Sequence, residues 1–208
     1  MRPNLKFHGE PPSLPPPRQA LRGGSLIVVM MILIIVSLLG VGGAQIALMS
    51  ERGARNDRDQ DVSWQAAEAA LHDAELEMTD PKATRASVFD GKTTSQFIEA
   101  CGTSGESIGL CALVPSGEPV WLKVDFMSPQ SNDNAPTAEF GQFTGRTFAA
   151  GGRGIQPEKK PRYIIELVPD PTGDKTGKTP PAYLFRVTAM GFGPRADTQS
   201  VLQMIYRK

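Results

Sequence analysis

The sequence lacks an excess of either charge, because 22 lysine and arginine residues balance 22 aspartate and glutamate residues. Proteins that bind nucleic acid through its phosphates usually present a strongly basic surface, and the neutral total argues against one. Histidine is scarce as well, with only two in 208 residues, and the two cysteines lack the CxxC spacing of a metal site. We therefore expect no nucleic-acid partner, no metal and no other cofactor.

No constellation of residues in the sequence predicts a catalytic site. His72 lies among carboxylates in a helical pattern, where a solvated side chain is its expected role. The glycines of "AAGGRGIQP" (149–157) lack the strand, the glycine spacing and the helix of a phosphate-binding loop. We therefore expect a protein that is not an enzyme and that serves assembly, anchoring or adhesion.

The only two cysteines, Cys101 and Cys111, are separated by nine residues. A disulfide between them would close a short loop and stabilise the fold by roughly 3 kcal/mol in the chain-entropy model. We expect a disulfide, which is the usual state of paired cysteines in an oxidising compartment. The alternatives are two buried free thiols, or a redox-active or metal-binding pair.

One apolar run dominates the N-terminal quarter of the chain. From Leu26 to Leu39 only Ser37 interrupts it, and small residues extend it to Met49, which gives 24 residues. A helix needs about 20 residues to cross the hydrocarbon of a bilayer, whereas the apolar core of a secretory signal has roughly 7 to 15. The run therefore predicts a membrane-spanning helix that is kept.

Basic residues precede this apolar run, with a single acidic residue among them. They are Arg2, Lys6, Arg18 and Arg22, against Glu10 alone. Positive charge close to a membrane span stays on the cytoplasmic side. We expect a single span in the inner membrane, with the N-terminus in the cytoplasm and the C-terminal part in the periplasm.

The helix is predicted to continue past the membrane, because no proline occurs between the apolar run and Pro81. Apolar residues at steps of three and four form a stripe on one helix face, which predicts contact with a sheet. The stripe consists of Trp64, Ala67, Leu71, Ala74 and Met78. The residue before a proline disfavours the α conformation, so we expect one helix over 24–79.

The C-terminal part predicts β structure. Alternating apolar residues, separated by turn compositions, predict antiparallel strands at 162–168, 182–192 and 199–208. Weaker patterns predict a strand at 119–127 and a short helix at 94–100, and a loop at 128–161 with a short strand in "GQFTGRTF" (141–148). The expected fold class is α+β: a long helix, half transmembrane and half amphipathic, packed on an antiparallel sheet.

The expected divisions of the chain follow these patterns. They are a leader (1–23), the membrane half of the helix (24–49), its amphipathic half (50–80), a loop-rich region with the cysteines (81–161) and the strands (162–208).

The stretch "RGGSLIVV" (22–29) resembles the class III signal of type IV pilins and of type II secretion pseudopilins. The resemblance implies a pilin fold and cleavage by prepilin peptidase between Gly23 and Gly24, with cleavage after Gly24 as the alternative. The new N-terminus would be methylated. The helix would then serve in assembly, beginning with Leu26, Ile27 and Val28.

Three glycines near the outer end of the apolar run weaken its helix propensity. They are Gly40, Gly42 and Gly43. By the resemblance, this zone unwinds partly inside a filament, while close packing of neighbouring helices explains the glycines equally well.

Val28 departs from the pilin pattern, in which the fifth mature residue is usually glutamate. By the resemblance, that glutamate pairs with the terminal amine of the subunit inserted before it. A subunit without it fits the first position of a filament, so Val28 favours a minor pilin that primes assembly.

Residues 21–77, including "SER" (50–52) and "QAAEAALHDAE" (65–75), resemble the PilX type of minor pilin. The implied partners are other minor pilins, the major pilin, prepilin peptidase and the pilus assembly platform, and the sequence leaves open whether an adhesin joins them at the tip. A type II secretion pseudopilin is the nearest alternative. A single-pass anchor with a periplasmic binding domain is another.

Overall fold

The computed structural model describes residues 24–114, 116–127, 135–152, 154–173, 183–195 and 197–207. The predicted leader at 1–23 lies outside the described residues. The chain forms two compact units, Met1–Glu51 and Arg52–Lys208.

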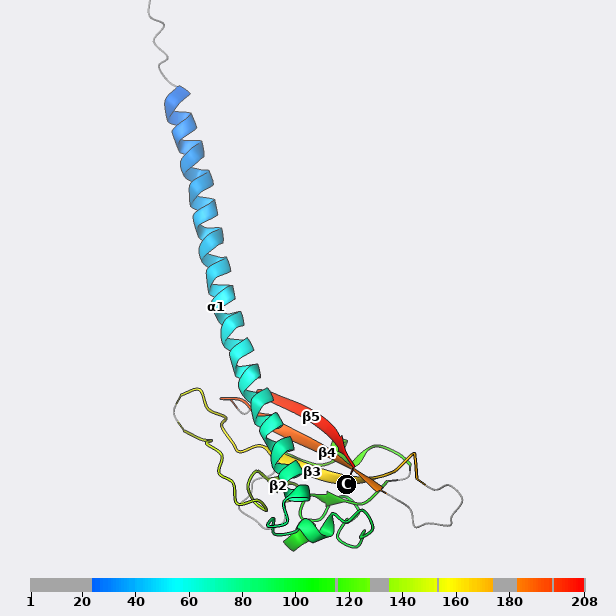
Figure 1. Cartoon of the computed structure of the whole chain (residues 1–208). Helices are drawn as coiled ribbons and strands as arrows, with labels where there is room; N and C mark the ends of the chain where they lie inside the picture. The colour runs from blue at the N-terminus through cyan, green and yellow to red at the C-terminus, as the bar shows by residue number, and fades with distance from the viewer. Residues whose placement is uncertain are drawn as a thin grey trace, which may run out of the picture. The chain divides into compact units, whose positions relative to one another are not determined.

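Helix α1 extends over Gly24–Thr79, a length of 56 residues, and Figure 1 shows it as one coiled ribbon. At its C-terminal end the N–H of Asp80 donates a 2.8 Å hydrogen bond to the carbonyl of Leu76. Pro81 follows and cannot continue the helix, because proline has no N–H and its ring clashes with the preceding turn. The predicted helix over 24–79 is confirmed.

Three long strands form an antiparallel meander, as predicted: β3 (Arg162–Pro169), β4 (Tyr183–Phe192) and β5 (Gln199–Tyr206). Two strands of two residues each pair with the other edge of β3. Of these, β1 (Leu110–Cys111) is parallel to β3 and β2 (Ala138–Glu139) is antiparallel to it. The sheet is therefore mixed rather than purely antiparallel, and strands this short carry no alternation that a sequence pattern could reveal.

Both faces of β3 are covered, which explains its nearly continuous apolar sequence. Tyr163 and Ile165 belong to the apolar core that includes α1. Ile164, between them, belongs to a second cluster that contains Cys101 and Cys111. The sheet therefore separates two apolar clusters, and one of these clusters rests on α1.

The side chains of β4 on the α1 side become smaller along the strand. Phe185, Val187 and Ala189 lie in the core with α1, and Gly191 follows at the next alternate position. A Cβ atom on Gly191 would collide with the backbone of α1 at Ser63. The taper leaves room for the backbone of α1 beside Gly191.

The predicted apolar stripe of α1 needs a correction at its N-terminal end. Trp64 is 49% exposed, and Ser63 occupies the buried position instead. The close approach at Gly191 leaves room only for a small residue there. Three other members of the stripe are fully buried: Ala67, Ala74 and Met78. Leu71 is partly buried against the core.

Two predictions for the loop-rich region are wrong. Residues 119–127 form a short 3-10 helix at Val120–Leu122 rather than a strand, because Val120 and Phe126 both turn inward against the disulfide. Residues 94–100 form turns rather than a helix. Ile98 makes an isolated bridge with Cys111 there, and Ala100 has φ of 60°, which no α-helix accommodates.

The short strand predicted within 141–148 is also wrong, since the strand of this segment is β2, three residues earlier. Gly141 has φ of 81° and opens a turn in which the N–H of Gly145 donates a 2.9 Å hydrogen bond to its carbonyl. Of the predicted loop at 128–161, residues 128–134 and 153 lie outside the described residues.

Candidate functional site

Residues 24–50 of α1 present a helix surface without a charged side chain. Every large apolar side chain on it is exposed, from 48% for Val29 to 70% for Met49. Helix α1 is long and apolar enough to cross a membrane, and no residue of its most apolar stretch is buried. A surface of this kind requires lipid or protein to cover it, because exposed apolar area costs about 25 cal/mol per Å² in water.

The residues predicted to serve in assembly all lie on this exposed stretch. Leu26, Ile27 and Val28 belong to the first turns of α1 and are more than half exposed. Side chains at the three glycines would have open space around them: Gly40, Gly42 and Gly43. The helix is continuous through them in this single chain. Gly24 is the first helical residue, while Gly23 lies outside the described residues.

A hydrogen-bonded serine pair fastens α1 to β5 beside the close approach at Gly191. The hydroxyls of Ser63 and Ser200 are 2.6 Å apart, and both residues are buried. The amide of Gln60, one turn earlier, donates to the Ser200 hydroxyl at 2.9 Å. Ser63 and Ser200 thus hold α1 against β5 through a hydrogen bond as well as through close packing.

Asp73, ten residues after Ser63 on α1, binds the loop that follows β2. Its side chain is fully buried, yet its carboxylate accepts hydrogen bonds from the Gly141 N–H at 2.7 Å and from the Thr144 hydroxyl at 2.6 Å. Arg146 lies 3.6 Å from the same carboxylate. These bonds compensate for burial of the charge, as a buried carboxylate requires.

A buried charged pair joins Glu77, on the last turn of α1, to Arg85, which follows the helix. The guanidinium of Arg85 donates to the Glu77 carboxylate, as does the Tyr163 hydroxyl from β3, and all three side chains are fully buried. Arg85 also donates to the carbonyls of Glu106 and Ile108 at 2.7 and 2.6 Å. This cluster connects the end of α1, the sheet and the loop before β1.

Burial dominates the titration of this cluster. Desolvation raises the pKa of Glu77 above its ordinary value, although the Arg85 charge acts in the opposite direction. Desolvation, with the Glu77 charge added, raises the pKa of Tyr163 well above its usual range. All three members of the cluster are fully buried, so their hydrogen bonds to one another replace the water that each has lost.

Sequence patterns alone did not single out Asp73 and Glu77. A signal was present, since Asp73 follows Ala70 by three positions and Glu77 follows Ala70 by seven, and Ala70 is buried. Acidic residues at these spacings belong to the buried face of a helix. An acidic residue on the buried face of a helix therefore predicts a buried hydrogen-bond or ion-pair partner on another element.

Two family models match the sequence of this chain. The model described as "Type IV pilus assembly protein PilX C-term" matches residues 51–208, and the model described as "PilX N-terminal" matches residues 22–72. The chain belongs to the PilX family. The match at 51–208 extends the likeness to PilX over the whole globular unit. No curated protein and no solved structure matches the chain significantly.

Membership in the PilX family makes the chain a type IV pilus minor pilin, a structural component of the pilus. The exposed apolar stretch at 24–50 is long enough to anchor such a protein in a membrane. The match to a pilus family favours the pilus over the type II secretion alternative.

The globular unit of this PilX protein contains the predicted disulfide between Cys101 and Cys111. Both cysteines are buried and pack with Val120, Phe126 and Ile164 on the sheet face opposite the core of α1. Cys101 has φ of 72°, so the loop reverses sharply at the bridge. The disulfide thus holds the loop-rich region against β3.

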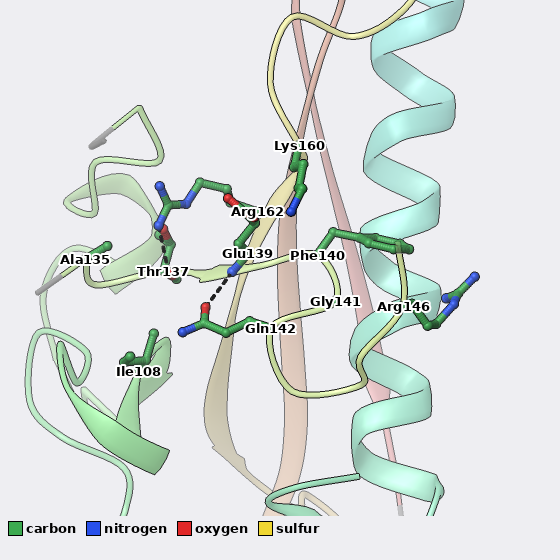
Figure 2. A pocket seen from close by; sticks show the side chains of 10 residues that line it. All are labelled: Ile108, Ala135, Thr137, Glu139, Phe140, Gly141, Gln142, Arg146, Lys160 and Arg162. Carbon is green, nitrogen blue, oxygen red and sulfur yellow. Dashed lines mark hydrogen bonds and ion pairs between the residues drawn. The ribbon is translucent and has the colours of Figure 1, made fainter. Parts of the chain in front are cut away.

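A hollow of about 220 Å³ lies beside β2 in the same unit, and Figure 2 shows the side chains that line it. Two of its cations face carboxylates: Lys160 donates to Glu139 at 2.8 Å, and Arg146 pairs with Asp73. Arg162 is 5% exposed and donates to the Thr137 carbonyl at 3.1 Å. Burial lowers the pKa of Arg162.

His72 is exposed, with its Nδ1 3.4 Å from the Glu75 carboxylate on the next turn. Within the described part of the chain, no group of three or more histidine, cysteine, aspartate and glutamate residues is placed to hold a metal ion.

Proposed function

We propose that the chain is a minor pilin that primes pilus assembly and occupies the first position, at the tip. The observation that supports this proposal is Val28, which stands at the fifth position after a cut between Gly23 and Gly24, on an exposed apolar helix. Valine cannot pair with the terminal amine of a preceding subunit. The first subunit of a filament has no predecessor, so it alone loses nothing by lacking the glutamate.

The same proposal gives the helix two successive environments. Before assembly, residues 24–50 cross the inner membrane with the leader in the cytoplasm and the globular unit in the periplasm. Prepilin peptidase then removes the leader, and the assembly platform transfers the helix into the filament. Packing against other minor pilins and the major pilin then replaces lipid around the apolar side chains, without any catalytic step by this chain.

The position of the protein in the pilus tests the priming role. We expect a label on the globular unit to appear at pilus ends only, and Val28→Glu to spread the label along the filament because the missing ion pair is restored. Val29→Glu is the matched control, since it adds the same charge one position away from the pairing site. Labelling of wild-type protein along the whole pilus at the abundance of the major pilin would refute the priming role.

A further inference from the structure

Arginines gather at the start of the globular unit, where α1 passes the loop between β4 and β5. They line a hollow of about 400 Å³ together with one amide and one carboxylate. Its lining residues are Arg52, Arg55, Asn56, Arg58, Asp59 and Arg195. We propose that this hollow binds the phosphodiester headgroup of an anionic phospholipid in the periplasmic leaflet of the inner membrane.

The helix and the loop converge for a physical reason. Arg52, Asn56 and Asp59 recur at steps of four and three, which places them on one face of α1. Gly193, just after β4, lies against that face, since a Cβ on it would be 2.9 Å from the Asp59 carbonyl. The loop therefore brings Arg195 to the helix, although these residues are more than 130 positions apart in the sequence.

The charge of the hollow and its immediate surroundings is net positive. Four guanidinium groups line the hollow together with the carboxylate of Asp59, which lies 3.9 Å from Arg58. Asp197 lies 3.4 Å from Arg195, and Glu51 stands one turn before Arg55. Asp57 and Asp61 follow Arg52 by five and nine positions, about 140° and 180° around a helix of 3.6 residues per turn, so they point elsewhere. Guanidinium groups bind phosphate oxygens in pairs of parallel hydrogen bonds, which makes an anionic phosphate the favoured ligand.

The membrane lies close to the hollow because the proposed membrane span, residues 24–50, ends just before Arg52. This step rests on the proposed function, in which residues 24–50 span the bilayer. These 27 uncharged residues are about 40 Å long as a helix, so a centred span extends about 5 Å beyond a hydrocarbon core of about 30 Å on each side. Arg52 then stands at headgroup level, and long arginine side chains reach back toward the phosphates.

Such a site would hold the globular unit at the membrane surface until the helix is extracted. A free phosphate ion shares the headgroup's charge but lacks acyl chains beside the exposed apolar helix. The two ligands are therefore separable, and the lipid is the one to which the proposal commits.

Native mass spectrometry of the full chain tests this proposal directly. The purified protein in detergent is titrated with equal amounts of phosphatidylglycerol and phosphatidylethanolamine. We expect wild-type protein to retain phosphatidylglycerol preferentially, and Arg52→Gln combined with Arg195→Gln to weaken that binding about tenfold, the effect of losing roughly one charge-assisted contact. Arg207→Gln is the matched control, because it removes one exposed arginine outside the hollow.

Three results would overturn the proposal. They are equal retention of both lipids by wild-type protein, unchanged retention by the double variant, and displacement of the lipid by millimolar inorganic phosphate, which would indicate a free-anion site. Both substituted arginines are exposed, so the fold should persist, and near-ultraviolet circular dichroism checks this. Lipid binding is measured on purified protein without pili. A chain that fails to bind the lipid can still lose its leader, and a chain that keeps its leader can still bind the lipid, so the two proposals fail separately.

Discussion

Gly191 of β4 and Ser63 of α1 approach so closely that no side chain fits between them. A Cβ atom on Gly191 would overlap the carbonyl oxygen of Ser63 and the amide nitrogen of Ala67, both of which belong to the helix backbone. Neither backbone group can move away without breaking the helix. The pair therefore sets the distance between α1 and the sheet, and the hydrogen bond between the hydroxyls of Ser63 and Ser200 fixes their register.

Gly191→Ala should destabilise the globular unit by about 3 kcal/mol, the upper part of the usual range for overpacking, because the new methyl group meets backbone atoms. Gly53→Ala is the matched control: it lies on α1 with open space around it, so the helix should gain up to about 1 kcal/mol. Urea unfolding of the full chain in detergent, followed by tryptophan fluorescence, measures both. Equal stability of the two variants would contradict the close approach.

The pH dependence of stability reports on Glu77. Burial raises its pKa above 4.5, against the opposing charge of Arg85 and the hydrogen bond from Tyr163, while Asp73 adds to the rise. The folded chain therefore binds the proton more tightly than the unfolded chain. Its contribution is complete below about pH 4.5 and is lost as the pH rises through the raised value.

The unfolding free energy of wild-type protein, minus that of Glu77→Gln, should accordingly decrease as the pH rises from 4.5, because only wild-type protein has the carboxyl group that loses its proton. Glu75→Gln, on the exposed side of the same helix, should show no comparable trend. A difference that grows with pH would mean that Arg85 lowers the pKa of Glu77 more than burial raises it. Unfolding curves at a series of pH values decide between the two.

Removal of the disulfide by Cys101→Ser with Cys111→Ser should lower the unfolding free energy by roughly 3 kcal/mol, because the unfolded chain gains the freedom of the opened loop. Reduction of wild-type protein should have a similar effect, and reductant should not change the double variant. A double variant as stable as the oxidised protein would show that Val120 and Phe126 hold this region without the bridge.

The sequence predicted the parts of the fold that are long and periodic. Helix α1 and strands β3, β4 and β5 each carry many residues with one repeat, so their patterns were clear. Strands β1 and β2 have two residues each and exist only because β3 offers them an edge. A contact between distant segments leaves no local pattern, which is why these two strands were missed.

The attachments of the helix were harder to predict than the helix itself. Asp73 binds Gly141 and Thr144 about 70 positions away, and Glu77 binds Tyr163 at 86 positions. Size and spacing alone predict Trp64 on the buried face of the helix. Its exposure follows from Gly191, a residue on another element, so only the tertiary structure reveals it.

The mass of the mature N-terminus tests the central claim most directly. For protein isolated from cells with prepilin peptidase, we predict loss of residues 1–23 and a methylated Gly24, with full-length protein in cells that lack the peptidase. Cleavage one residue later would make Val29 the fifth mature residue. Valine would still stand at that position, and Val29→Glu would become the test with Val28→Glu as its control. An intact N-terminus in peptidase-containing cells would contradict it, because a chain that keeps its leader remains a membrane anchor and cannot enter a pilus.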